Sequence, residues 1–140
     1  MVENSDFDFA FDKQTMGVDL KSRVRDLEDL KITAFHEAGH TLVALYSKEA
    51  NPIHKVTIVA KGQSGGHTGF LPKKESTWHQ TRSQLLALLD VGMGGRAAEE
   101  LIFGKDNVTG GASSDLNNAS NIAEAMVKEL AMSEKVKIFI

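Results

Sequence analysis

The segment LKITAFHEAGHTLVALYSK, residues 30–48, decides how this chain can fold and what it can hold. Apolar residues recur at helical spacing through it, so the sequence predicts a helix. At its centre stands HEAGH, residues 36–40, a His-Glu-x-x-His motif. Residues four apart lie on one face of a helix, so the imidazoles of His36 and His40 can reach a single metal ion.

On a helical wheel the two histidines fall within one narrow arc. Larger and apolar side chains fall on the far side: Ala34, Phe35, Ala38, Leu42, Leu45 and Tyr46. We therefore expect the far side to be buried in the core and the histidines to lie on another face. Glu37 directly follows the first histidine, as in zinc peptidases, where this glutamate is the general base.

Two histidines do not complete a catalytic zinc site, which usually has three protein ligands and a water. The metzincin extension of the motif is excluded, because it needs Gly and His where this chain has Val43 and Tyr46. The third ligand must therefore be distant, and Glu99, Glu100, Asp115 or another histidine could supply it. Asp115 follows a Gly-rich loop and begins a predicted helix, whose N-terminus favours a carboxylate. Aspartate is common there for capping alone, so the residues themselves leave the choice open.

Composition narrows the class of protein. The chain has 140 residues, 41% of them hydrophobic and 25% charged, which suits one globular domain. Its net charge is −3 and it has no basic stripe, so nucleic-acid binding is not indicated. It has no cysteine, so a metal would be held by His, Asp or Glu. No apolar run approaches the roughly 20 residues of a membrane span, and the acidic start does not resemble a signal or transit peptide.

The remaining segments predict a mixed architecture. Residues 1–25 look irregular, as a linker or a short edge strand. Strands are expected at Lys55–Ala60 and, weakened by glycines, at Gly66–Leu71. A helix is expected from about Gln80, ended by Gly104. Three glycines inside it indicate either a break or close packing of a neighbour: Gly92, Gly94 and Gly95.

A last helix is expected from Asp115 to about Met132, with Ser113 or Ser114 as its N-cap.

Three linked motifs carry a family resemblance. HEAGH, MGGRAAEELIFG at residues 93–104 and GGASSDL at residues 110–116 occur in this order and at these spacings. Together they resemble the FtsH family of membrane-bound AAA proteases. KITAFHEAGH and PIHKVTIV are similar to its mitochondrial intermembrane-space type. The resemblance extends from about Phe7 to the last residue.

The resemblance implies roles for individual residues. His36, His40 and Asp115 match the zinc ligands of the family, and Glu37 matches its catalytic glutamate. Glu99 and Glu100 match a helix near the site. A further segment matches the strand beside the family's active-site cleft, and a substrate could add to it as an extra strand. This segment includes Gly66, His67, Thr68 and Gly69.

The resemblance also implies a fold and a function. The expected fold is mainly α with a small β-sheet, with a zincin-like helix, truncated at the C-terminus. Residues 1–29 would be a linker from an ATPase module, and residues 30–140 a partial peptidase domain. The implied function is ATP-dependent zinc metalloendopeptidase activity on unfolded or membrane proteins. The resemblance further implies assembly as a hexamer and a location at the mitochondrial inner membrane.

ATP and Mg²⁺ would act only through a module outside these residues, because the chain has no G-x-x-x-x-G-K-[ST] loop. The membrane would likewise be reached only through other segments. This shortness motivates an alternative, in which the chain is a catalytically inactive remnant that binds protease subunits. The complete set of His36, Glu37, His40 and Asp115 argues against it, since a remnant has no physical need to keep all four groups.

Overall fold

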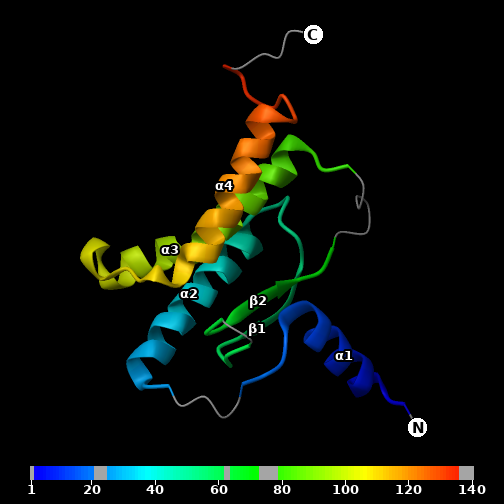
Figure 1. Ribbon diagram of the computed structural model, residues 1–140, viewed down its shortest axis with the longest axis vertical. Coiled ribbons are helices and arrows are strands. Elements are labelled where there is room, and N and C mark those ends of the chain that lie inside the picture. Colours follow the sequence, from blue (N-terminus) through cyan, green and yellow to red (C-terminus); the bar gives the residue numbers. More distant parts are fainter. Residues whose placement is uncertain (1, 21–24, 62–63, 73–78, 136–140) are drawn as a thin grey trace.

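A computed structural model describes residues 2–20, 25–61, 64–72 and 79–135 of the chain. It is mainly helical with a two-stranded sheet, which confirms the expected fold class (Figure 1). Within these ranges, no helix is both long enough and apolar enough to cross a membrane. The elements in chain order are α1 (Asn4–Met16), α2 (Leu27–Tyr46), β1 (Ile53–Thr57), β2 (His67–Phe70), α3 (Arg82–Phe103), the short 3₁₀ helices η1 (Lys105–Asn107) and η2 (Gly110–Ala112), and α4 (Ser113–Lys128).

The contact between α2 and α3 organises the molecule, and we call it the helix crossing (Gly39 on α2, Gly94 and Gly95 on α3). A Cβ atom added at Gly39 would lie 2.3 Å from the backbone oxygen of Gly94, and one added at Gly94 would lie 2.7 Å from that of Gly39. Helix axes approach this closely only where a side chain is missing. The predicted close packing at the glycines of α3 is therefore confirmed, and the helix runs through them unbroken.

The face of α2 that is buried differs from the predicted one. Leu42, Leu45 and Tyr46 are 56%, 67% and 89% exposed, so the expected core face is wrong for these three. The other members of that face, Ala34, Phe35 and Ala38, are half-buried. The helix crossing explains the difference, since it accepts only small residues from α2 at the closest point. The histidine arc turns with Gly39 toward α3, and the large apolar residues are left outward. The buried positions of α2 are Glu37, Gly39, His40 and Ala44.

The ends of the helices follow local rules. The Asp26 side chain accepts the backbone N–H of Asp29 and caps α2. Thr81 and Gln84 form a reciprocal capping box at the start of α3. At its other end Gly104 has a φ of 83°, a conformation that favours glycine, as predicted.

The sheet is a short antiparallel hairpin under α2. Thr57 lies opposite His67, and Val56 lies opposite Thr68. Both strands are within or near their predicted ranges, but β1 begins at Ile53 and ends before Ala60. A small apolar cluster fixes the hairpin to the two long helices: Ala44, Ala50 and Val91, with Val43, Ile53 and Phe70 packed against them.

Residues near the N-terminus were predicted to be irregular, and this is wrong for α1. The helix begins with a capping box between Glu3 and Asp6. The buried Asp12 side chain bonds His54 and Lys55 on β1, and Phe11 packs edge-on against the His54 ring. Tertiary contacts with the sheet therefore hold this helix in place.

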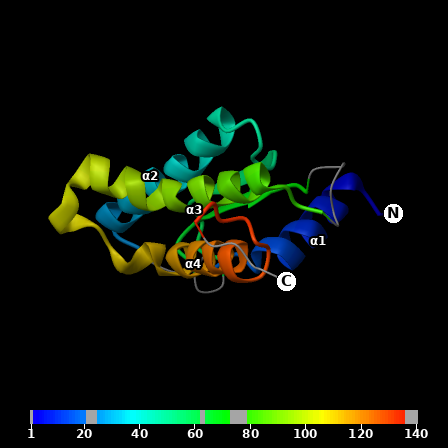
Figure 2. The same cartoon turned by 90° about the horizontal axis from the view of Figure 1, so that it is seen from above.

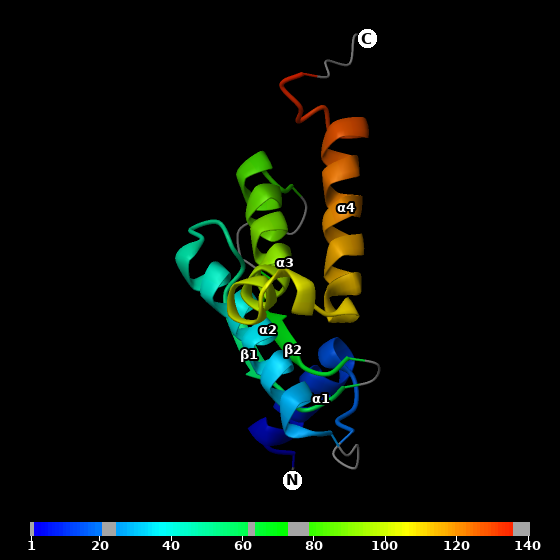
Figure 3. The same cartoon turned by 90° about the vertical axis from the view of Figure 1, so that its left-hand side faces the viewer.

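The last helix lies beside α3, and the views from above and from the side show both helices (Figures 2 and 3). It begins at Ser113 and ends at Lys128, four residues earlier than predicted. Neither Ser113 nor Ser114 is its N-cap, because the turn of η2 leads into the helix and places Ala112 there. Asp115 stands in the first turn, as expected.

Candidate metal centre

The two histidines of α2 face each other at the helix crossing. Their rings meet edge to face, with centroids 4.7 Å apart, and their Nε2 atoms are 3.0 Å apart. The side chains of His36 and His40 are only 12% and 9% exposed. One helical turn between them produces this approach, as the i, i+4 spacing predicts.

The second nitrogen of each ring is already engaged. Nδ1 of His40 lies 2.7 Å from the backbone oxygen of Val91, which can only accept, so Nδ1 carries the proton. Nδ1 of His36 lies 2.7 Å from Oε1 of the buried Glu99. In the neutral imidazoles, both Nε2 atoms are consequently left with a lone pair directed at the same point.

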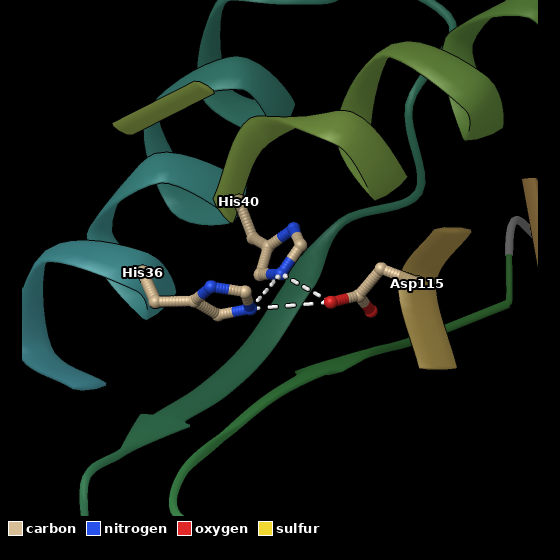
Figure 4. Close-up of side chains that lie close together, drawn as sticks. All are labelled: His36, His40 and Asp115. Atoms are coloured by element: carbon tan, nitrogen blue, oxygen red, sulfur yellow. Dashed lines mark hydrogen bonds and ion pairs between the residues drawn. The ribbon is translucent and has the colours of Figure 1, made fainter. Parts of the chain in front are cut away.

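Asp115 closes the cluster from α4. Its Oδ2 atom lies 3.2 Å from Nε2 of His36 and 3.5 Å from Nε2 of His40 (Figure 4). Three atoms that donate electron pairs thus lie together, although His36 and Asp115 are 79 positions apart in the sequence. Such a group is stable only with a proton or a cation between its members.

The cluster fits a zinc ion in donor type and in spacing. Zinc bonds of about 2.0–2.2 Å place neighbouring donors of a tetrahedron roughly 3.3–3.6 Å apart. The three donor–donor distances are 3.0, 3.2 and 3.5 Å, so a small outward shift of the rings admits the ion. A Cβ atom added at Gly95 would lie 2.5 Å from Nε2 of His36 and 2.6 Å from Nε2 of His40. The absence of a side chain at Gly95 therefore keeps open the space into which both nitrogens point.

The pKa shifts of the residues in and around the cluster also indicate a site that favours a cation. Burial disfavours the charged imidazoles and is the largest single influence on them. Hydrogen bonds to Asp115, together with that of His36 to Glu99 and that of His40 to the Val91 oxygen, outweigh burial and raise the pKa of both histidines. Burial also disfavours the Asp115 carboxylate, yet the two histidines hold the pKa of that carboxyl well below its usual range. Bonds from Thr109 and His36 likewise outweigh burial and lower the pKa of Glu99. The cluster thus favours positive charge at its centre.

Glu37 lies buried beside the cluster, 6% exposed. Its Oε2 atom accepts a hydrogen bond of 2.6 Å from the hydroxyl of Thr68 on β2. The neighbouring Gly66 is also close, since a Cβ atom there would lie 3.0 Å from Cγ of Glu37. The carboxylate is therefore held between α2 and the hairpin.

A cleft of about 840 Å³ runs past these groups, between the hairpin and α4. Gly66, His67 and Thr68 line it, whereas Gly69 turns toward α1, where an added Cβ would meet Met16. The predicted cleft set is therefore brought together except for Gly69. Burial lowers the pKa of His67, which lines the cleft together with His36 and His40. Apolar lining residues include Phe70, Leu88, Val91 and Ile122.

The two adjacent glutamates of α3 separate in the structure. Glu99 is 1% exposed and contacts the outer nitrogen of His36, while its Oε2 accepts the backbone N–H and hydroxyl of Thr109. Glu100 points outward toward Lys105. The sequence reasoning did not identify Thr109 or the Val91 oxygen. Nothing in the sequence marks a backbone carbonyl as a partner of a histidine. The paired glycines of α3 did, however, predict that another element packs closely on that helix.

Comparisons with known proteins indicate the same class of protein as the geometry of the cluster does. Residues 23–140 match the sequence model of peptidase family M41. The chain is 55% identical over 127 residues to "ATP-dependent zinc metalloprotease YME1L" of Drosophila melanogaster, covering 91% of this chain and 17% of that protein. It is 49% identical over 138 residues to human "ATP-dependent zinc metalloprotease YME1L1", covering 99% and 18%.

A plant relative is similar to almost the same extent. The chain is 46% identical over 135 residues to "ATP-dependent zinc metalloprotease FTSH 11, chloroplastic/mitochondrial" of Arabidopsis thaliana, covering 96% of this chain and 17% of that protein. The chain therefore spans less than a fifth of the length of these three relatives.

Proposed function

The chain belongs to peptidase family M41, and we propose that it is the zinc-dependent peptidase part of an ATP-dependent metalloendopeptidase. The observation that carries the proposal is the convergence of His36 Nε2, His40 Nε2 and Asp115 Oδ2 on one point beside the buried Glu37. Three protein donors leave a fourth position of a tetrahedron for water or substrate. That is the arrangement of a catalytic zinc site, whereas structural zinc sites are closed by four ligands.

In this proposal the three donors hold the ion, and Glu37 moves the proton. A bound zinc ion supplies Lewis-acid chemistry, acidifying water and polarising a peptide carbonyl. Glu37 takes the proton of the attacking water and returns it to the leaving amine. Glu99 fixes the ring of His36 through Nδ1, and the Val91 oxygen fixes that of His40, so neither ring must reorient when the ion binds.

The cleft supports a polypeptide substrate. It passes the donors and is walled on one side by β2, to which an extended peptide can add as a further strand. Gly66 and His67, which line the cleft, would lie next to the peptide. We propose unfolded or membrane-derived polypeptides as the substrate class.

The wider setting is proposed from the family. ATP hydrolysis, hexamer assembly and attachment to the mitochondrial inner membrane would be functions of segments outside these 140 residues. The division between a linker at residues 1–29 and the peptidase domain at 30–140 belongs to the same proposal. Fractionation of cells with an antibody to this chain would test the compartment.

One observation favours an assembly role without catalysis. Leu101 and Ile102, at the end of α3, are 84% and 47% exposed, as a docking helix would be. In that case the chain would bind other protease subunits and cleave nothing.

Zinc content and proteolysis decide between the two functions. We expect the purified chain to hold one zinc per chain by elemental analysis and to cleave casein. Glu37→Gln should keep the zinc and lower cleavage by at least about 100-fold, because the general base is lost. Glu100→Gln, an outward-facing neighbour in sequence of Glu99, is the control and should behave as wild type. A chain that binds no zinc, or a Glu37→Gln variant as active as wild type, would contradict the proposal.

A further inference from the structure

Thr68 contacts Glu37, the proposed base, and is not one of the three donors. Its side chain points from β2 into the interior, and the residue is 8% exposed. Its Oγ1 atom lies 2.6 Å from Oε2 of Glu37 and 3.4 Å from the backbone oxygen of Glu37. A hydroxyl has one proton to donate, and the shorter bond to the ionised group is the stronger. Thr68 therefore donates to the carboxylate.

This bond fixes the orientation of Glu37. Among the described residues, Thr68 is the one that hydrogen-bonds to the Glu37 carboxylate, and the bond uses Oε2 alone. Oε1 is consequently left for the water. Gly66 packs against the stem of the same side chain, so two neighbouring residues of the hairpin restrict it. A carboxylate tied at one oxygen keeps the other in a defined position, which a general base requires.

The bond also connects the base to the wall of the cleft. Thr68 belongs to β2, the strand beside which a peptide would lie, and Glu37 belongs to α2, which carries the donors. The location of Glu37 is thus defined relative to the substrate strand as well as to the metal. A misplacement of about 1 Å can cost on the order of 100-fold in rate, so this connection matters to catalysis.

We propose that Thr68 is a positioning residue for Glu37, holding the base at the distance from the cleft at which it can reach the attacking water. The inference rests on the proposed function, because positioning matters only if Glu37 is the base. It assigns no proton transfer to the Thr68 hydroxyl.

The test compares three variants of the zinc-loaded chain on a fluorogenic peptide. Thr68→Val removes the hydroxyl and keeps the shape, whereas Thr68→Ser keeps the hydroxyl. Thr57→Val makes the same change on β1, where the Thr57 hydroxyl accepts the backbone N–H of Val59 instead. We expect Thr68→Val to lower kcat by about 10- to 100-fold with KM within about twofold and zinc content unchanged. Thr68→Ser should recover most of the rate, and Thr57→Val should match wild type.

A binding measurement gives a readout apart from turnover. A peptide hydroxamate binds zinc and transfers its hydroxyl proton toward the base, so its Kd reports the position of Glu37. Thr68→Val should raise this Kd by about tenfold, and Thr68→Ser should not. Equal loss in the Val and Ser variants, or no loss in either, would overturn the inference.

The two proposals fail in different ways. If wild type is active and Glu37→Gln is not, while Thr68→Val equals wild type, only the role of Thr68 is overturned. If wild type neither cleaves the peptide nor binds the hydroxamate, the proposed function is wrong and the inference is overturned with it.

Discussion

The candidate metal centre joins two parts of the molecule that are built in different ways. At the helix crossing, α2 and α3 touch through bare backbone at Gly39 and Gly94, and both histidine rings are tied at their second nitrogen. On the α4 side, Asp115 is 26% exposed and stands in the first turn of a helix without a side-chain cap. The crossing therefore fixes two donors rigidly, whereas the third depends on how α4 docks.

This difference shows on which side the site is most sensitive to substitution. A change at the crossing has no space to relax, because close-packed backbone cannot move without separating the helices. A change at Asp115 alters one side chain at the edge of a cleft. Substitutions on the two sides should therefore separate loss of the space for the ion from loss of a ligand.

Gly95→Ala should have the largest effect. The new Cβ would lie within 2.6 Å of both Nε2 atoms, so we expect zinc binding to be abolished, measured by elemental analysis and by competition with a chelator. Gly92→Ala is the matched control on the same helix, because no atom lies within 4 Å of its added Cβ. The control should keep zinc and gain about 0.5–1 kcal/mol of stability from helix propensity. Zinc binding by Gly95→Ala at wild-type affinity would show that the crossing does not bound the site.

Asp115→Asn should follow in size. It removes the negative donor without changing the shape, so we expect the affinity for zinc to fall by about 100-fold or more, while the circular dichroism of the chain stays unchanged. Asp106→Asn, an exposed change in η1, should leave the affinity as it is. If Glu99→Gln lowers the affinity sharply and Asp115→Asn does not, the assignment of the third ligand is wrong.

Glu99→Gln should have an intermediate effect, because Glu99 connects the two sides. One oxygen contacts His36 on α2, and the other accepts two bonds from Thr109, shortly before α4. Loss of the charge should lower zinc affinity by about 10- to 100-fold, as for other partners of metal-bound histidines. Its neighbour Glu100, 39% exposed, provides the control substitution Glu100→Gln, for which titration calorimetry should give the wild-type Kd.

Asp12→Asn should have the smallest effect and should leave zinc binding unchanged. The Lys55 ammonium, followed by His54, lowers the pKa of Asp12 below its ordinary value of 3.8. Because the pKa is lowered, the carboxylate stabilises the fold fully at pH values above its ordinary pKa of 3.8. This stabilisation is lost as the pH falls through the lower pKa of the folded state. We expect the variant to melt a few degrees lower at pH 7, with the difference shrinking below about pH 4. A change in zinc content would show that α1 is coupled to the centre.

The N-terminal helix and the exposed face of α2 show why some local predictions were wrong. In DFDFAFD the phenylalanines alternate as in a strand, and Phe7 and Phe9 remain 67% and 69% exposed in the helix. The contacts of Asp12 with the sheet decide the conformation there, and they lie more than 40 residues away. On α2, the large apolar residues indicated a core face, but the closest approach of two backbones selected the small residues instead.

By itself the sequence determined what depends on near neighbours. The spacing of His36 and His40 places two imidazoles on one face of a helix, and Gly104 ends α3 because its backbone conformation favours glycine. Only the tertiary structure decided which carboxylate meets those imidazoles and which contacts them from behind. Glu99 and Asp115 have similar chemistry, and local propensities say nothing about how α3 and α4 dock on α2. The space that Gly95 leaves between them likewise exists only once the helices have crossed.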